Sequence, residues 1–390
     1  MSAIPNAAAA RPAAETDPVR VMVVDDSVVI RGLVSRWIDE DRSMAVVAAH
    51  RNGKLAVDDI ERSNPDVVVL DIEMPELDGL SALPLMLKKK PELAVVMAST
   101  LTRRNAEISL KALSLGAADY VPKPESNSGV TTSVDFRRDL IEKVKHLGLR
   151  ARGRNRRRNM APAPDRPAQA RTASCPSTAP AAKPISALTT KPYSRVAPRA
   201  LVIGSSTGGP QALAEVFQHI GPAMSRVPVL VTQHMPPTFT SILAEHVAKT
   251  AARPCSEGED GEPIVPGRIY IAKGGLHMLV EKAASGPIIR LADTAPVNFC
   301  KPAVDPLFKT ASEVFGSALL AAVLTGMGND GAEGARIVSE AGGSVVTQDE
   351  ETSVVWGMPG ATAKTGVCSD ILPLPQIGPK LARLISGGRP

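Results

Sequence analysis

Hydroxyl, imidazole and carboxylate side chains each follow a short apolar run in the second half of this 390-residue chain. In chain order they are Ser205, Ser206 and Thr207, then His234, and then Asp330. A serine hydroxyl becomes a good nucleophile when an imidazole accepts its proton, and a carboxylate fixes the tautomer of that imidazole. If the three runs are parallel strands of one sheet, their carboxyl ends meet at one edge. The pattern therefore predicts a serine-hydrolase triad, which is recognised by geometry and not by chain order.

The nucleophile of this triad can be either Ser205 or Ser206 on chemistry alone. Both lie in the turn 204–209, before a helical pattern whose first residues include Pro210, and the fixed φ of proline suits the first turn of a helix. Glycines on both sides of Met327 would let backbone N–H groups turn inward as an oxyanion hole. A nucleotide-binding turn is the rival interpretation. The turn has neither the spacing G-x-G-x-x-G nor the lysine of G-x-x-x-x-G-K-[ST], which disfavours that rival.

A second set of charged and hydroxyl side chains follows apolar runs in the first half of the chain. It consists of Asp25, Asp26, Asp71, Ser99, Thr100 and Lys123. Three carboxylates at one edge of a sheet repel each other unless a cation joins them, and oxygen ligands suit Mg²⁺. A lysine and a hydroxyl on flanking strands would contact an incoming phosphoryl group. The set therefore predicts a phosphoryl site that holds magnesium.

Alternating apolar runs and helical patterns must position both sets. In the first half, strands are expected near 21–26, 46–49, 66–75, 93–100 and 118–124, with helices near 28–39, 53–63, 79–88, 105–115 and 134–148. Strict alternation of apolar strands with helices predicts a five-stranded parallel sheet covered on both faces. In the second half, apolar runs lie at 201–203, 227–232, 269–272, 276–281, 287–292, 318–325 and 344–347, with helical patterns near 210–219, 238–250, 304–315 and 332–341. These predict a larger, mostly parallel, doubly wound α/β domain.

The basic charge of the chain is concentrated between residues 150 and 199. This span holds twelve Lys and Arg residues, one Asp and eight prolines, whereas the rest of the chain is net acidic. Proline and charge repulsion favour an extended, solvated linker. The arginine run is also compatible with contact to nucleic acid, but no aromatic residues interleave it. Residues 1–18 are rich in Ala and Pro and are expected to be disordered.

Membrane insertion, secretion and cysteine chemistry are not indicated. No apolar run approaches the length of a membrane span, and the N-terminus lacks the basic-then-apolar order of a signal peptide, so we expect a cytoplasmic protein. The four cysteines lie far apart and form no C-x-x-C pair. Neither a zinc site nor a disulfide framework is therefore expected.

The first half of the chain resembles the receiver domain of bacterial two-component systems. The resemblance covers about residues 20–146 and rests on DD at 25–26, LDIEMPELDG at 70–79, MAST at 97–100 and YVPKP at 120–124. It implies a flavodoxin-like five-stranded sheet and phosphorylation of Asp71 by a histidine kinase. It further implies these roles: Mg²⁺ ligands Asp25, Asp26 and Asp71, phosphoryl contacts Ser99 and Lys123, and the rotating switch aromatic Tyr120.

The second half resembles the catalytic domain of the chemotaxis protein-glutamate methylesterases, the CheB family. The motifs are GSSTGGPQAL at 204–213, QHMPPTFT at 233–240, LTGMGNDGAEG at 324–334 and QDEETSVVWGMPGA at 348–361. The family motif usually reads G-A-S-T-G-G, so the resemblance selects Ser206 as nucleophile. It also implies these roles: base His234, carboxylate Asp330, Thr207 beside the nucleophile and Met327 at the oxyanion hole.

One stretch departs from the family pattern. Residues 299–303 read Phe-Cys-Lys-Pro-Ala, where the family more often has His-Arg-Pro-Ser. We expect this departure at Cys300 and Lys301 to change how the loop meets the substrate and to leave the triad unchanged.

Together the resemblances imply a phosphorylation-activated serine carboxylesterase. The expected domains are a disordered tail (1–18), a receiver (19–147), a linker (148–197) and a methylesterase domain (198–387). The enzyme would demethylate glutamate 5-methyl esters on chemoreceptors, releasing methanol, and deamidate receptor glutamines through the same acyl-serine, which gives sensory adaptation in chemotaxis.

The resemblances also set expectations about cofactors, partners and control. They imply Mg²⁺ at the receiver only, no cofactor at the esterase, and a monomer whose partners are chemoreceptors and a histidine kinase. We expect the unphosphorylated receiver to cover the esterase edge. The alternative is a response regulator with a nucleic-acid- or nucleotide-binding output.

Overall fold

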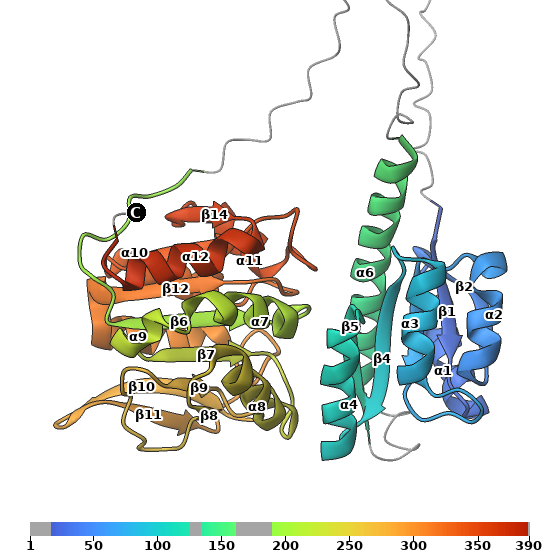
Figure 1. Cartoon of the computed structure of the whole chain (residues 1–390), viewed down its shortest axis with the longest axis horizontal. Helices are drawn as coiled ribbons and strands as arrows, with labels where there is room; N and C mark the ends of the chain where they lie inside the picture. Colours follow the sequence, from blue (N-terminus) through green and yellow to red (C-terminus); the bar gives the residue numbers. More distant parts are fainter. Residues whose placement is uncertain (1–16, 125–133, 161–188, 389–390) are drawn as a thin grey trace, which may run out of the picture.

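The chain folds into two α/β domains, each built on its own parallel sheet (Figure 1). The structure, a computed structural model, describes residues 17–124, 134–160 and 189–388. The expected N-terminal tail up to residue 16, the middle of the expected linker and Cys175 lie outside the described residues.

The N-terminal sheet has the strand order β2-β1-β3-β4-β5, and every neighbouring pair is parallel. Its strands are β1 (Val19–Val24), β2 (Met44–His50), β3 (Val67–Asp71), β4 (Ala94–Thr100) and β5 (Asp119–Lys123). Its helices are α1 (Val28–Asp39), α2 (Gly53–Ser63), α3 (Gly79–Lys89), α4 (Arg103–Ser114) and α6 (Val134–Met160). The predicted five-stranded parallel sheet is confirmed. The strand order reverses between β1 and β3, the usual place of a ligand site in such sheets.

Side-chain caps fix where four of these helices begin. Ser27, Asn52, Asp78 and Thr102 each accept a hydrogen bond from the backbone N–H three residues ahead. Such a cap satisfies one of the backbone N–H groups that lack an intrahelical partner. The loops between strand ends and these helices are therefore held at defined positions.

The C-terminal sheet has seven strands in the order β14-β13-β12-β6-β7-β9-β8, all parallel. Its strands are β6 (Ala200–Ser205), β7 (Val229–Gln233), β8 (Cys255–Glu257), β9 (Ile269–Ile271), β12 (Leu319–Val323), β13 (Ser344–Gln348) and β14 (Asp370–Leu372). Its helices are α7 (Gly209–Ile220), α8 (Phe239–Ala251), α9 (Val304–Phe315), α10 (Ala332–Glu340), α11 (Met358–Lys364) and α12 (Leu374–Ile385), with short 3₁₀ turns at Ala223–Arg226 and Gly316–Ala318. The predicted doubly wound fold is confirmed, and β8, β14, α11 and α12 are additions to it.

Two of the predicted strands do not join this sheet. β10 (His277–Ala283) and β11 (Gly286–Ala292) pair only with each other, antiparallel, as a separate hairpin. Only residues 284 and 285 separate them, and a connection this short cannot make the crossover that parallel strands require. Apolarity alone did not distinguish them from the strands of the main sheet.

The helix that closes the N-terminal domain is longer than its sequence pattern predicted. α6 continues to Met160, although a linker was expected from residue 148. Ala151 is fully buried in the N-terminal core, and a side chain at Gly148 would collide with Val19 and Val67. This stretch therefore packs closely on the sheet, and no proline interrupts it before Pro162.

The far end of the expected linker is also ordered onto a domain. The Tyr193 hydroxyl donates to Asp370 Oδ2 at 2.6 Å, and the Lys191 backbone N–H donates to Cys368 O at 2.8 Å. The C-terminal domain therefore holds the chain before residue 198, where we expected that domain to begin.

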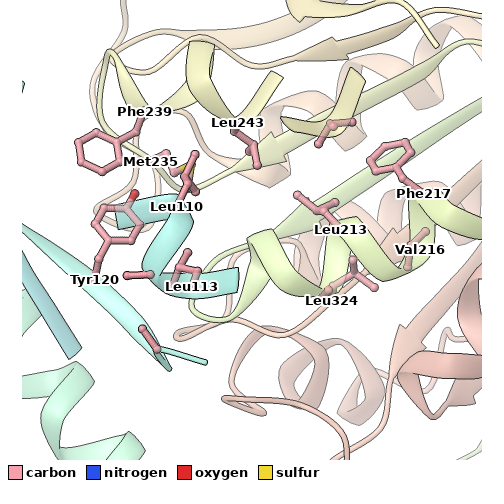
Figure 2. Packing of buried hydrophobic residues seen from close by; sticks show 14 of the residues in the cluster. Leu110, Leu113, Tyr120, Leu213, Val216, Phe217, Met235, Phe239, Leu243 and Leu324 are labelled. Atoms are coloured by element: carbon pink, nitrogen blue, oxygen red, sulfur yellow. The ribbon is translucent and has the colours of Figure 1, made fainter. Parts of the chain in front are cut away.

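One hydrophobic cluster continues from the N-terminal domain into the C-terminal domain. It includes Leu110 and Leu113 of α4 and Leu213 and Leu243 of the other domain (Figure 2). The ring of Tyr120 stacks on Phe239, with centroids 4.7 Å apart and planes within 4° of each other.

Polar contacts border this interface, and its packing is incomplete. Arg103 pairs with Glu245 at 2.7 Å, and Gln211 Nε2 donates to Ala117 O at 3.0 Å. A cavity of about 530 Å³ remains between α4, α7 and α8.

In the parts of the chain that the structure covers, no helix has both the length and the apolar composition needed to cross a membrane.

Candidate active site

The two serines after β6 have different environments. Ser205 is fully buried, and its Oγ donates to Gln233 Oε1 at 2.7 Å. Ser206 is partly exposed, and within the described part of the chain its Oγ makes no hydrogen bond. Gln233 Nε2 donates to Ser206 O at 2.9 Å, which holds the backbone of the turn. The geometry therefore gives Ser205 a structural contact and leaves the hydroxyl of Ser206 available.

His234 and Asp330 meet at the carboxyl edge of the C-terminal sheet. His234 directly follows β7, Asp330 follows β12, and both strands flank β6. The two side chains lie 2.8 Å apart, from His234 Nε2 to Asp330 Oδ2. The predicted parallel arrangement thus brings the imidazole and the carboxylate together. The strand order reverses between β6 and β12, so this edge is also a topological switch point.

Asp330 is held by hydrogen bonds on both oxygens. Besides His234, its donors are Asn298 Nδ2 and the backbone N–H groups of Val304, Asp305 and Gly331. Burial alone would raise the pKa of Asp330, but the hydrogen bond and charge of His234 and the backbone donors outweigh it and lower the pKa to about 2. Asp330 is therefore ionised and fixed in orientation.

A second carboxylate lies directly behind Asp330. Asp305 Oδ1 accepts hydrogen bonds from Gly331 N at 3.0 Å and Gly334 N at 2.7 Å, which fixes the start of α10. Asn298 Nδ2 donates to Asp305 Oδ2 at 3.0 Å as well as to Asp330. Burial and the charge of Asp330 raise the pKa of Asp305 to about 6. Sequence reasoning did not identify Asn298 or Asp305, because neither belongs to the strand ends that it searched.

The other nitrogen of His234 faces a cysteine. Cys300 Sγ lies 3.3 Å from His234 Nδ1. Burial favours the neutral ring, but the hydrogen bonds and charges of Asp330 and Cys300 outweigh it and raise the pKa of His234 to about 10. We expected the departure at Cys300 to bear on the substrate and not on the triad. The thiol contacts the candidate base, while the hydrogen bond between His234 and Asp330 is kept.

The loop that carries Cys300 is anchored by a buried histidine. His277 Nε2 lies 3.1 Å from Ala295 O, and His277 Nδ1 accepts from Ala303 N at 3.1 Å. Accepting at Nδ1 and donating at Nε2 requires the neutral ring with its proton on Nε2. One side chain thereby fixes both ends of the loop. His277 was also missed, since in the sequence it is one residue at the start of an ordinary apolar run.

Two further features lie in the turns that follow β6 and β12. The Thr207 side chain is buried, and its Oγ1 has no hydrogen-bond partner among the described residues. The backbone N–H groups of Met327 and Gly328 likewise donate no hydrogen bond within the described ranges. Gly326 touches the nucleophile turn so closely that a Cβ there would lie 2.8 Å from Ser206 Cβ. Met327 and Gly328 belong to the glycine-flanked stretch from which the sequence predicted an oxyanion hole.

The N-terminal sheet gathers its predicted acidic set at the ends of β1 and β3. One carboxylate oxygen from each of Asp25, Asp26 and Asp71 lies within 4.8 Å of the others. Lys123 Nζ lies 2.6 Å from Asp71 Oδ1 and 3.0 Å from Asp25 Oδ2. Burial raises the pKa of Asp71, the charge of Lys123 lowers it, and the charge of Asp25 raises it again. The net result is a pKa of about 6. Two buried carboxylates and one exposed one leave an excess of negative charge beside Lys123, and a set of oxygen donors only fits a divalent cation such as Mg²⁺.

Ser99 and Tyr120 are placed differently from the acidic set. Ser99 Oγ lies 2.9 Å from Ser109 Oγ on α4, so in this state its hydroxyl bonds to the helix. Tyr120 points into the interface between the domains, where it stacks on Phe239. Lys143 of α6 donates to Tyr120 O at 2.7 Å and pairs with Asp119 at 2.8 Å. Ser99 is therefore linked to α4, and Tyr120 is linked to the domain interface.

α6 lies against the loops that surround Ser206 and His234. Arg138 places its guanidinium 5.2 Å from the centre of the Phe299 ring, and Arg150 Nη2 donates to Glu351 O at 3.1 Å. Met327 and Val354 pack against the hydrophobic cluster that contains the apolar face of α6. The N-terminal domain therefore covers part of the candidate active-site edge.

Comparison with known proteins covers both domains. Residues 201–381 match the family model described as CheB methylesterase, and residues 21–135 match the one described as response regulator receiver domain. A protein-glutamate methylesterase/protein-glutamine glutaminase of Rhodopseudomonas palustris (strain HaA2) is 57% identical over 97% of both chains. The group 2 operon protein of the same name from Bradyrhizobium diazoefficiens is 56% identical over 96% of both.

Solved structures include one of each type of domain. The CheB methylesterase catalytic domain of Thermotoga maritima is 39% identical, with 49% of this chain and 99% of that chain covered and a TM-score of 0.46. The response regulator domain of Thermotoga maritima CheB is 38% identical, with 34% of this chain and 97% of that chain covered and a TM-score of 0.30.

Proposed function

The chain belongs to the CheB methylesterase family, and from that premise we propose which of its residues act and how the receiver controls them. The protein is a protein-glutamate methylesterase with protein-glutamine glutaminase activity and an N-terminal receiver domain. It serves adaptation in chemotaxis by demethylating glutamate methyl esters. We propose a receiver that begins near residue 19 and a catalytic domain that ends near residue 387. The linker, expected at 148–197, is proposed to be shorter at both ends, because α6 packs on the receiver sheet as far as Ala151 and Lys191 and Tyr193 are bonded to the catalytic domain.

We propose Ser206, His234 and Asp330 as the catalytic residues. Ser206 Oγ attacks the ester carbonyl while His234 Nδ1 accepts its proton, and the imidazolium then protonates the departing methanol. Water then attacks the acyl carbonyl while the same nitrogen accepts its proton, and the imidazolium returns that proton to Ser206 Oγ as the glutamate carboxylate leaves. Asp330 holds Nε2–H, which leaves the Nδ1 lone pair for this work. The contact that supports the proposal is the 2.8 Å hydrogen bond between His234 Nε2 and Asp330.

Backbone donors and Thr207 complete the proposed site. The free N–H groups of Met327 and Gly328 would stabilise the oxyanion as it forms. The unpartnered hydroxyl of Thr207 lies next to Ser206 in sequence and would gain a partner when substrate or His234 approaches. Glutamine side chains of the receptor would pass through the same acyl-serine, with ammonia as the leaving group.

At the receiver, Asp71 is the proposed phosphoryl acceptor. Asp25, Asp26 and Asp71 would hold Mg²⁺, which neutralises charge as the phosphoryl group arrives, and Lys123 would contact that group. The hydroxyl of Ser99 would break its hydrogen bond with Ser109 and contact the phosphoryl group as well. A histidine kinase is the proposed phosphodonor, and methyl-accepting chemoreceptors are the proposed substrate. We further propose that the protein acts in the cytoplasm as a monomer.

We propose that the described state is the closed, unphosphorylated one. α6 lies over the active-site loops at Phe299 and Glu351, and α4 packs on α8. Phosphorylation of Asp71 would draw Ser99 away from α4 and move Tyr120, which loosens this interface. The alternative, a nucleic-acid-binding output, is not favoured by the two family matches.

Replacing Asp71 with asparagine should abolish stimulation of methanol release by an acyl phosphate. The amide cannot accept a phosphoryl group, and it also removes one of the three clustered carboxylates. The measurement is methanol release from methylated receptor with and without the phosphodonor. Asp58→Asn is the matched control, because it removes the same charge from an exposed position on α2. Stimulation that survives in Asp71→Asn would exclude Asp71 as the acceptor.

Replacing Phe239 with leucine should raise the activity of the unphosphorylated enzyme about two- to tenfold. Leucine keeps most of the buried apolar volume but loses the stack on Tyr120, and aromatic pairs contribute about 0.5–1.5 kcal/mol beyond their burial. Activity after phosphorylation should change little. Phe217→Leu, in the core of the same domain, is the control for a general loss of packing. Equal basal rates in Phe239→Leu and Phe217→Leu would show that the stack does not restrain the enzyme.

A further inference from the structure

Cys300 occupies the nitrogen of His234 that the mechanism assigns to Ser206. Asp330 binds Nε2 at 2.8 Å, so Nδ1 is the nitrogen left for the nucleophile, and Cys300 Sγ lies 3.3 Å from it. One imidazole nitrogen carries either a lone pair or a proton. While Nδ1 is engaged with sulfur, it cannot accept the proton of Ser206.

We propose that Cys300 is a positioning residue that restrains the catalytic base: its thiol engages His234 Nδ1 in the closed enzyme, and His234 serves Ser206 only after this contact breaks. The inference rests on the proposed function and deepens it, because it assigns a means of control to the same site. It concerns the departure from the family pattern at residues 299–303.

The loop that holds Cys300 is tightly constrained. Val297 and Cys300 exchange two backbone hydrogen bonds, of 3.1 and 2.9 Å. Between them Asn298 and Phe299 take φ values of 51° and 63°, in the left-handed region that costs energy for residues with a side chain. His277 fixes both ends of the loop. The position of the thiol is therefore set by the loop as a whole.

The receiver holds this loop from outside. Phe299 is 82% exposed, and its ring lies under the guanidinium of Arg138 on α6. Cys300 is the next residue and is itself partly buried. Separation of α6 from Phe299 would remove an external contact from a strained turn. The restraint at His234 is thus coupled to the same interface that covers the active-site edge.

The charged and titratable groups around His234 are few. From the turn after β12, Asp330 contacts Nε2, and from the loop before α9, Cys300 contacts Nδ1. From α9, Asp305 faces Asp330 and not the ring. The neighbouring cation Lys301 is bound to Asp293 at 2.5 Å.

The contact has a definite effect on the charge of the ring. Burial favours neutral imidazole, but Asp330 and Cys300 outweigh it, so the pKa of His234 is raised to about 10 and the ring is protonated at neutral pH. A protonated ring is not a base. Activity should therefore rise with pH as the ring loses its proton. Removing Cys300 takes away one of the two groups that raise this pKa, which moves the rise to lower pH.

The first test measures the contact without any ester. Full-length wild type and His234→Gln are treated with iodoacetamide at pH 7, and alkylation of each cysteine is followed by mass spectrometry. The thiolate attacks carbon and iodide leaves, so the rate reports the thiolate fraction. We expect Cys300 to react about tenfold more slowly or slower still in His234→Gln, because glutamine cannot take the thiol proton. Burial raises the thiol pKa of both Cys255 and Cys368 to about 12, so both are slow internal controls.

The second test measures the restraint. Methanol release is followed against pH for wild type, Cys300→Ala and Cys300→Ser, each with and without an acyl phosphate. Without phosphodonor, both variants should be faster at pH 7, by about tenfold for each pKa unit that His234 falls, with an unchanged KM. With phosphodonor the advantage should shrink, since the contact is already broken.

The outcomes separate the inference from the proposed function. Equal pH profiles for wild type and Cys300→Ala, or alkylation of Cys300 that does not depend on His234, would overturn the restraint. A change in KM alone would make Cys300 a substrate contact and overturn it too. If no protein hydrolyses the ester, the proposed function fails, while the alkylation rates still decide whether His234 engages Cys300.

Discussion

Replacing Ser206 with alanine should lower kcat for ester hydrolysis by about 10⁴-fold or more, whereas Ser205→Ala should keep the activity within about tenfold. Within the described residues Ser206 Oγ makes no hydrogen bond and Ser206 is partly exposed, whereas Ser205 Oγ is committed to Gln233 in the core. Loss of that buried hydrogen bond should cost about 1–3 kcal/mol of folding free energy. Methanol release and thermal unfolding of both variants test this contrast.

The two serine variants serve as controls for each other. Ser206→Ala should unfold like wild type but be inactive, and Ser205→Ala should unfold earlier but be active. Both should keep their response to an acyl phosphate at Asp71, which can be followed through phosphoryl incorporation. Activity that survives in Ser206→Ala would move the nucleophile to another hydroxyl, and the proposed mechanism would have to be abandoned.

Replacing Asp330 with asparagine should lower kcat about 10⁴-fold with little change in KM. An amide nitrogen at the Oδ2 position would face His234 Nε2 and Val304 N, both of which now donate to oxygen. His234 would then carry its proton on Nδ1, the nitrogen that must accept from Ser206. In other triads the same carboxylate-to-amide change, which leaves the imidazole in the wrong tautomer, has an effect of this size.

Asp305→Asn is the matched control for Asp330→Asn. It makes the same chemical change on the neighbouring buried carboxylate, which binds Gly331 N and Gly334 N and does not touch the imidazole. We expect it to cost stability but to lower kcat far less than Asp330→Asn. The pH–rate profile separates the two, because only Asp330→Asn should alter the ionisation of His234. Equal losses of kcat would mean that the acidic pair acts as a unit.

The sequence predicted the sheets and the strand ends well, because each rests on short-range regularities. Apolar strands in strict alternation with helices specify parallel sheets, and parallel sheets place the residues that follow their strands at one edge. This is why His234 and Asp330 were expected to meet, and they do. The end of α6 was missed because Arg, Asn and Gly carry no apolar period there, although Gly148 and Ala151 pack on the sheet.

The parts of the site that sequence reasoning missed all depend on long-range contacts. Asn298 lies 32 residues from Asp330 in the chain and reaches it only because an irregular turn points its amide there. Cys300 lies 66 residues from His234 and comes from a loop, not from a strand end. Periodicity says nothing about such loops. The unusual residue pair at 300 and 301 could be seen in the sequence, but the sequence did not indicate that Cys300 would contact His234.

The stack of Tyr120 on Phe239 makes the two sites thermodynamically reciprocal. If closure of the domains opposes phosphorylation of Asp71, then phosphorylation opposes closure by the same free energy, and a coupling of 1–2 kcal/mol changes an affinity about five- to thirtyfold. Anything that holds the domains apart should then tighten binding of a phosphoryl mimic at Asp71. A methylated receptor segment bound at Ser206 would hold the domains apart. The affinity of Asp71 for a phosphoryl mimic would then depend on how much substrate is bound.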